Sequence, residues 1–231
     1  MKDAGIRWLP VSETSLMLYL VDTIDVQLAP VIGAISRKIK AECPDVCEVI
    51  PSYTSILVET RSFGIALDGL GEKVLGLARQ VMESHGDADS GKLIELPVYY
   101  HPEVGQDLDA LAKCAAMSVE EVISIHSGRD YRVCAIGFAP GFAFLAEVDE
   151  RIAVPRHASP RSRVPAGSVG IADSQTAVYP ADTPGGWHLI GNCPVPLYDP
   201  QKQPSSPFEV GDRIRFLPID RETFIERGGR V

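Results

Sequence analysis

The second half of the chain is a series of short apolar segments separated by glycine and proline, and this pattern restricts the fold more than any other feature. From Tyr131 onward each apolar piece is only a few residues long, and turn residues follow it. Many short strands with frequent turns are typical of a β-barrel or a β-sandwich. The segments that we expect to be strands are Arg132–Ile136, Val169–Ala172, Thr176–Tyr179, Trp187–Ile190, Val195–Tyr198 and Arg213–Phe216.

The first part of the chain has a different pattern, in which strand and helix signals alternate. Leu16–Val21 is a short apolar run bounded by polar residues, which predicts a strand. Apolar residues then recur at helical spacing from Leu28 to Ile39, and Pro44 predicts that this helix ends near Cys43. Two strands and a second amphipathic helix follow, so the order predicts a small α+β unit. The strands are Val46–Ile50 and Tyr53–Glu59, and the helix is marked by Leu70, Val74, Leu77 and Val81.

A polar, glycine-containing segment separates these two patterns. Residues 84–92 (SHGDADSGK) are the best candidate for a linker. We therefore predict an α+β protein with an N-terminal α+β domain over residues 1–88 and a second domain over residues 89–231. The second domain should begin with a half-buried strand at Ile94–Val98 and a helix at Leu108–Ala116. Ser118 and Glu121 have the spacing of a capping box, which predicts another helix through Ile125.

The overall composition excludes several classes of protein. The chain has 231 residues, of which 45% are hydrophobic, so we expect a packed core rather than disorder. A formal net charge of −9 makes a nucleic-acid partner a poor expectation, because that binding depends on neutralising phosphates. No apolar run approaches the roughly 20 residues that span a bilayer, and MKDAGIRWLP lacks a secretory apolar stretch. We expect a cytoplasmic protein without membrane association.

Cysteines and histidines do not have the spacing of a metal site. The cysteines are odd in number and scattered, which favours structural thiols over a disulfide framework. The histidines lack HExxH or HxH spacing, so no metal site is predicted. His157 and His188 are candidates for proton transfer, because histidine titrates near neutrality. A lone histidine is, however, more often a surface residue that takes no part in proton transfer.

Three arginines gather in the middle of the second half. Arg156, Arg161 and Arg163 fall within eight residues, each next to a proline or one step from one. Guanidinium groups bind carboxylate or phosphate through two parallel hydrogen bonds. We expect these three side chains to point into a shared cavity that binds a negatively charged ligand. The alternative is a set of structural salt bridges to aspartate and glutamate.

Glycines and aromatic residues surround the arginines. Glycine permits close backbone approach, which can expose N–H groups to an anion, but it serves tight barrel turns more often. The aromatic residues fit a pocket wall and a barrel core equally well. Neither a Walker-type GxxxxGK[ST] nor a GxGxxG after a strand occurs, so this chain should not bind ATP through a P-loop. The aromatic residues are Phe138, Phe142, Phe144, Tyr179 and Trp187.

Four segments together resemble a known family. They are GFAPGFAFL at 137–145, PRHASPRSRVPAGSVGI at 155–171, QTAVYP at 175–180 and TPGGWHLIG at 183–191. In this order and spacing they resemble the family called allophanate hydrolase subunit 1, which includes the B subunit of 5-oxoprolinase and the bacterial sporulation-kinase inhibitor. The resemblance covers nearly the whole chain and is weakest over the first ninety or so residues.

The resemblance implies both a fold and a function. The implied fold is a small N-terminal α+β domain followed by a cyclophilin-like β-barrel. The implied function is a hydrolase subunit that is inactive alone. It would act with two partners: a second barrel protein, of the type that forms the C subunit of 5-oxoprolinase, and a third component. Together they would hydrolyse 5-oxo-L-proline to L-glutamate at the expense of ATP. Two alternatives remain open: the carboxyltransferase half of a urea carboxylase or allophanate hydrolase-type system, and a protein inhibitor of a histidine kinase.

The resemblance also supplies a set of site residues by position. They are expected to line the barrel pocket and to bind a small anionic substrate, and the family pattern assigns no catalytic role to any of them. Departures from that pattern occur at Ala143-Phe144, Ser159, Ser162 and residues 172–174, and they leave the ligand open. The expected site residues are Phe138, Pro140, Gly141, Phe142, Arg156, Arg161, Arg163, Pro165, Gly167, Ser168, Gln175, Tyr179, Pro184, Gly185, Gly186 and Trp187.

Overall fold

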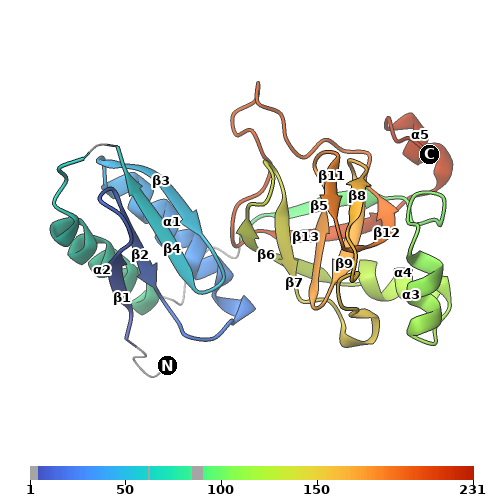
Figure 1. The fold of residues 1–231 in the computed structure, drawn as a ribbon, viewed down its shortest axis with the longest axis horizontal. Helices are drawn as coiled ribbons and strands as arrows, with labels where there is room; N and C mark the ends of the chain where they lie inside the picture. Colours follow the sequence, from blue (N-terminus) through green and yellow to red (C-terminus); the bar gives the residue numbers. More distant parts are fainter. Residues whose placement is uncertain (1–4, 62, 85–90) are drawn as a thin grey trace. The chain divides into compact units, whose positions relative to one another are not determined.

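The computed structural model describes residues 5–61, 63–84 and 91–231 (Figure 1). The chain divides into two compact units. One comprises residues 1–91 with Cys134–Ile136 and Glu209–Asp212, and the other comprises Lys92–Val133, Gly137–Phe208 and Arg213–Val231. The predicted boundary between residues 88 and 89 lies outside the described residues, as does most of the predicted linker. Within the described ranges, no helix combines the length and the apolar character that crossing a membrane requires.

The N-terminal unit is built on a four-stranded antiparallel sheet with the strand order β1-β2-β4-β3. The three strands predicted in this part are confirmed as β2, β3 and β4. Strand β1 was not predicted, because it is an exposed edge strand with little apolar alternation. The strands are β1 (Arg7–Pro10), β2 (Ser15–Tyr19), β3 (Val46–Pro51) and β4 (Ser55–Thr60).

Two helices cover this sheet and confirm the predicted α+β unit. Helix α1 (Ala29–Glu42) follows a 3-10 turn, η1 (Val26–Leu28), and packs against β3 and β4. Helix α2 (Leu67–Glu83) packs against β1, β2 and α1. The buried face of α1 carries Ile32, Ile35 and Ile39, which recur at helical spacing. The helix ends at Cys43, as Pro44 predicts.

The second unit is a nearly closed barrel with the strand order β12-β9-β10-β7-β6-β13-β5. Tyr99, which follows β5, exchanges two backbone hydrogen bonds of 2.9 Å with Asn192 at the end of β12. This bridge brings the two edges of the sheet together, so the predicted barrel is confirmed. The strands are β5 (Leu93–Val98), β6 (Asp130–Ile136), β7 (Ala143–Ala146), β9 (Ser168–Ala172), β10 (Gln175–Val178), β12 (His188–Asn192) and β13 (Arg213–Pro218).

Three short helices accompany the barrel. Helix α3 (Leu108–Cys114) contacts β12, and α4 (Val119–Ser127) contacts α3 and β13. The predicted capping box is confirmed, with hydrogen bonds in both directions between Ser118 and Glu121. Helix α5 (Arg221–Glu226) was not predicted, and a 3-10 turn, η2 (Glu150–Ile152), follows β7.

A neutral histidine completes the barrel core. His126 of α4 is fully buried and stacks on Phe216 with ring centroids 4.7 Å apart. The Thr176 hydroxyl donates to the Gly170 carbonyl, so its oxygen accepts from Nε2 of His126 at 2.9 Å. Nδ1 is then the acceptor for the Tyr100 hydroxyl at 2.8 Å. Burial lowers the pKa of His126 to about 3, which keeps the ring neutral.

A two-stranded ribbon carries much of the motif-rich sequence. Strands β8 (Arg161–Val164) and β11 (Thr183–Gly185) pair in antiparallel fashion with a register shift. Neither strand was among those predicted. The prediction of a strand at Val195–Tyr198 is wrong, because this segment is irregular. Pro194 and Pro196 have no N–H group to donate to a neighbouring strand.

Candidate functional site

A buried ion pair connects the ribbon to the start of α3. Nη2 of Arg161 lies 2.6 Å from Oδ1 of Asp107, whose side chain is only 10% exposed. The other carboxylate oxygen, Oδ2, accepts the Leu189 N–H at 2.7 Å, and the Asp107 N–H donates to the Leu189 carbonyl at 2.9 Å. Burial raises the pKa of Asp107, but the Leu189 N–H and Arg161 outweigh it, so the net shift is downward. Asp107 is therefore an ionised carboxylate that fixes Arg161 against β12.

Two histidines stack beside this pair. The rings of His157 and His188 have centroids 3.8 Å apart and an interplanar angle of 29°. Nε2 of His157 lies 3.4 Å from Oδ1 of Asp107. Nε2 of His188 donates to the Pro155 carbonyl at 3.0 Å, which leaves Nδ1 with the free lone pair. Burial and the neighbouring His157 lower the pKa of His188, so this ring is neutral at pH 7.

These groups are poorly suited to hold a metal ion. Ligand atoms of Asp107, His157 and His188 all lie within 4.8 Å of one another. However, the Arg161 guanidinium already occupies Oδ1 of Asp107, and a cation there would repel a metal ion. The cluster instead combines a fixed ion pair with two stacked imidazole rings.

The aromatic residues of the motifs form a compact cluster. Phe142, Tyr179 and Trp187 are at most 5% exposed and belong to one hydrophobic core. Phe142 meets Tyr179 and Trp187 edge to face, with centroid distances of 5.3 and 5.7 Å. Arg156 lies over the Trp187 ring at 5.7 Å. Phe138 remains 64% exposed at a backbone φ of 70°, which is unusual for an aromatic residue.

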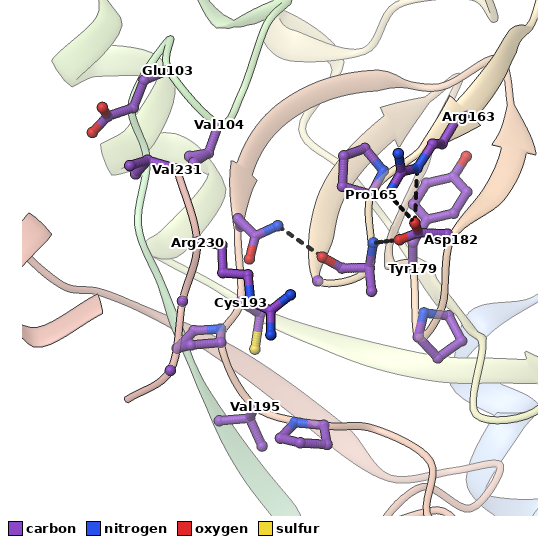
Figure 2. Close-up of a pocket in the computed structure, with 18 of the residues that line it drawn as sticks. Glu103, Val104, Arg163, Pro165, Tyr179, Asp182, Cys193, Val195, Arg230 and Val231 are labelled. Carbon is purple, nitrogen blue, oxygen red and sulfur yellow. Dashed lines mark hydrogen bonds and ion pairs between the residues drawn. The ribbon is translucent and has the colours of Figure 1, made fainter. Parts of the chain in front are cut away.

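A pocket of about 640 Å³ includes Arg163 of β8 in its lining (Figure 2). Arg163 lies in its wall and is ion-paired with Asp182 at 2.6 Å. The Ala166 N–H also donates to Asp182 at 2.8 Å, and these two contacts lower the pKa of the Asp182 carboxylate. The lining comes from the loop after β8, the loop after β12 and the C-terminal segment. The lining residues include Glu103, Val104, Gln106, Arg163, Pro165–Gly167, Tyr179, Pro180, Asp182, Asn192–Pro196 and Gly228–Val231.

The expected site residues are distributed over several places. Arg163, Pro165, Gly167 and Tyr179 line the pocket. Arg161 joins Asp107 instead, and Arg156 lies over Trp187, so the three guanidinium groups do not converge on one partner. The residues that lie outside the described pocket lining are Phe138, Pro140, Gly141, Phe142, Arg156, Arg161, Ser168, Gln175, Pro184, Gly185, Gly186 and Trp187.

Sequence reasoning missed several residues of these sites. Asp107 precedes the apolar start of a helix, which is the usual signal of a helix cap, yet its side chain makes no cap hydrogen bond. Its partner Arg161 is 54 residues away, so no local pattern connects them. Asn192 and Cys193 gave no signal as pocket residues, and neither did Arg230, which stands in a glycine-rich end of the chain.

Comparison with known proteins defines the family. Residues 6–208 match the model of the carboxyltransferase domain, subdomain C and D. This chain belongs to that family. The B subunit of 5-oxoprolinase from Bacillus subtilis is 36% identical, and the match covers 93% of each chain. The protein of the same name from Escherichia coli O157:H7 is 36% identical over 90% of this chain and 94% of its own. The resemblance expected from the motifs is confirmed.

Two solved structures agree with the fold. The crystal structure of TTHA0988 superposes with a TM-score of 0.76 at 32% identity, covering 89% of this chain and 40% of that chain. Kluyveromyces lactis urea carboxylase gives a TM-score of 0.71 at 15% identity, covering 95% of this chain and 22% of that chain. The latter likeness concerns the fold alone. In both proteins the counterpart of this chain is one part of a much longer polypeptide.

Proposed function

We propose that this chain is the B subunit of an ATP-dependent 5-oxoprolinase, which hydrolyses 5-oxo-L-proline to L-glutamate together with partner proteins. The observation that carries the proposal is the 36% identity to the Bacillus subtilis 5-oxoprolinase protein over 93% of both chains. Matching over nearly full length means that both units of this chain have a counterpart in that protein. The motif segments of the barrel lie inside the matched family region, residues 6–208.

The chemistry of the reaction explains why partners are needed. A lactam amide is stabilised by resonance, and its carbonyl must be activated, here by phosphoryl transfer, before water opens the ring. The chain has no P-loop sequence. On this proposal ATP binds at the level of the complex, on the third component, and a barrel protein of the C-subunit type binds beside this chain. The chain alone then has no activity.

The barrel supplies rigid positions for groups that act within the complex. Asp107 and Arg161 lock each other in place, and the Leu189 backbone fixes the carboxylate from a second side. Asp182 holds the loop after β8 by accepting the Ala166 N–H, and Arg163 forms an ion pair with the same carboxylate. Fixed charges of this kind support binding without reorganisation when a substrate arrives. In this proposal these groups shape the binding surface, and the bond-breaking groups belong to the assembled complex.

Reconstitution with the partner proteins tests the proposal. The three components are co-expressed and purified, and glutamate release from 5-oxo-L-proline is measured with and without ATP. We expect ATP-dependent release from the complete set and none when this chain is omitted or is present alone. The proposal fails if the complete set is inactive while the same partners with the Bacillus subtilis B subunit release glutamate.

A carboxyltransferase role is the second candidate, because the matching family model is that of a carboxyltransferase domain. In this case the chain would help to move CO₂ from carboxybiotin to a urea-like nitrogen, with an arginine holding a carboxylate. The test is transfer of labelled carboxylate from a carboxybiotinylated carrier to urea in the presence of this chain and its barrel partner. Urea-dependent loss of label from the carrier would favour this role over lactam hydrolysis.

A further inference from the structure

The charged side chains in the wall of the 640 Å³ pocket differ in whether they have an interaction partner. Glu103 accepts hydrogen bonds from the Tyr99 hydroxyl at 2.6 Å and from Arg221 at 3.1 Å. Arg163 and Asp182 neutralise each other at 2.6 Å. The fourth charged side chain is Arg230, which has no ion-pair partner among the described residues. The pocket therefore presents one uncommitted guanidinium group, and Figure 2 shows it extending from the C-terminal segment into the pocket.

The remaining wall suits a small apolar ring. Prolines 165, 180, 194 and 196 and Val195 supply aliphatic surface, and prolines have no N–H group to donate. The volume lies in the range of about 300–1,000 Å³ that is usual for small-molecule sites. If the ring of a ligand packs on these residues, few backbone N–H groups are near enough to donate to a negatively charged group of that ligand. The Arg230 guanidinium would therefore have to bind this group.

Two further lining residues complete the polar contacts. Nδ2 of Asn192 donates to the Ala166 carbonyl at 3.0 Å, which leaves Oδ1 to accept an N–H from a ligand. Burial raises the pKa of the Cys193 thiol to about 11, so this side chain is neutral at pH 7 and adds no repulsion for an anion. The pocket wall thus contains the guanidinium group of Arg230, the amide oxygen of Asn192 as an acceptor, and aliphatic surface.

We infer that this pocket binds a small cyclic monocarboxylate that carries an amide, with Arg230 holding the carboxylate and Asn192 accepting the amide N–H. The choice of a lactam acid rests on the proposed function, whereas the anion preference rests on the charges alone. Arg230 lies outside residues 6–208, so the family match does not include the group that gives the pocket its charge. The C-terminal segment therefore acts as a specificity-determining part of the site.

Binding to the full chain tests this inference with three probes that share a five-membered ring. 5-Oxo-L-proline has ring, amide and carboxylate, 2-pyrrolidinone lacks the carboxylate, and cyclopentanecarboxylate lacks the amide. Titration calorimetry or NMR should show the tightest binding for 5-oxo-L-proline. Arg230→Gln should weaken that binding at least tenfold and leave 2-pyrrolidinone unaffected. Arg227→Gln makes the same charge change at an exposed position outside the described lining, and it should alter binding less than twofold.

The assembled complex provides the second measurement. If the chain alone is too weak a binder, the KM for 5-oxo-L-proline in the complex should rise at least tenfold with Arg230→Gln and not with Arg227→Gln. Equal effects of the two variants, or equal binding of 2-pyrrolidinone and 5-oxo-L-proline, would overturn the inference. An active complex that is insensitive to Arg230→Gln would leave the proposed function standing and remove this pocket. An inactive complex, together with carboxylate binding that depends on Arg230, would leave this pocket standing and remove the proposed function.

Discussion

The guanidinium of Arg161 and the carboxylate of Asp107 form a 2.6 Å ion pair between residues 54 positions apart. The pair joins the β8–β11 ribbon to the segment before α3, and the Leu189 N–H connects the same carboxylate to β12. Breaking one partner of a buried pair leaves the other charge without compensation, which costs more than the pair itself contributes.

Asp107→Asn should lower the free energy of unfolding by about 2–3 kcal/mol, because Arg161 loses its counter-charge while the shape of the side chain is kept. Urea unfolding followed by fluorescence measures the change. Asp109→Asn, at an exposed position in the first turn of α3, is the matched control and should cost less than about 1 kcal/mol. Similar losses for both variants would mean that the ion pair does not stabilise the barrel.

The same carboxylate should give the protein an acid-sensitive stability. The pKa of Asp107 is lowered in the folded state, so the unfolded state binds its proton first as the pH falls. The stabilisation is complete above the unfolded pKa of about 3.9 and is lost progressively below it. Unfolding free energies at pH 5.5 and pH 3.5 should therefore differ more in the wild-type chain than in Asp107→Asn. Parallel pH profiles for the two chains would contradict the assignment.

His126 should add a second pH dependence at milder acidity. Its pKa is about 3 when folded and about 6.5 when unfolded, so the unfolded state takes up a proton between these values. The resulting loss is about 1.4 kcal/mol between pH 7.5 and pH 5.5. His126→Gln should lower stability at both pH values but show a pH difference smaller by that amount. Equal pH differences in the wild-type chain and in His126→Gln would contradict a neutral His126 in the core.

Much of the fold was predictable because its signals are local. The helix that ends at Cys43 is set by the apolar spacing of α1 and by Pro44, and the helix at α4 is set by the pair Ser118 and Glu121. Strand β1 escaped prediction because an exposed edge strand has no apolar alternation. The segment 195–198 failed for a different reason, because Pro194 and Pro196 cannot donate to a neighbouring strand and Val195 lines the pocket instead.

The site was less predictable because its contacts are not local. Proximity in sequence suggested that Arg156, Arg161 and Arg163 share a cavity. Their partners come from Trp187, Asp107 and Asp182, which no periodicity in the sequence connects to them. A register shift in the β8–β11 ribbon also breaks the simple alternation of side chains.

Glycine substitutions test the geometry of the pocket wall. Gly167 has a φ of 81°, and a Cβ there would collide with the Cys193 carbonyl and the Asn192 side chain. Gly167→Ala should therefore destabilise the protein by about 2 kcal/mol or more. Gly76 lies inside α2 with open space around it, so Gly76→Ala should stabilise by about 0.5–1 kcal/mol. Thermal unfolding of both variants measures the contrast, and a neutral Gly167→Ala would contradict the described backbone.

Exchange of the homologous component is the most direct test of the proposed role in lactam hydrolysis. The Bacillus subtilis 5-oxoprolinase partner proteins are purified without their own B subunit, this chain is added, and glutamate formed from 5-oxo-L-proline is measured with ATP. We predict that this chain restores ATP-dependent glutamate formation, and that the amount formed rises with added chain until the partners are saturated. No restoration by this chain, under conditions in which the native B subunit restores activity fully, would contradict the account.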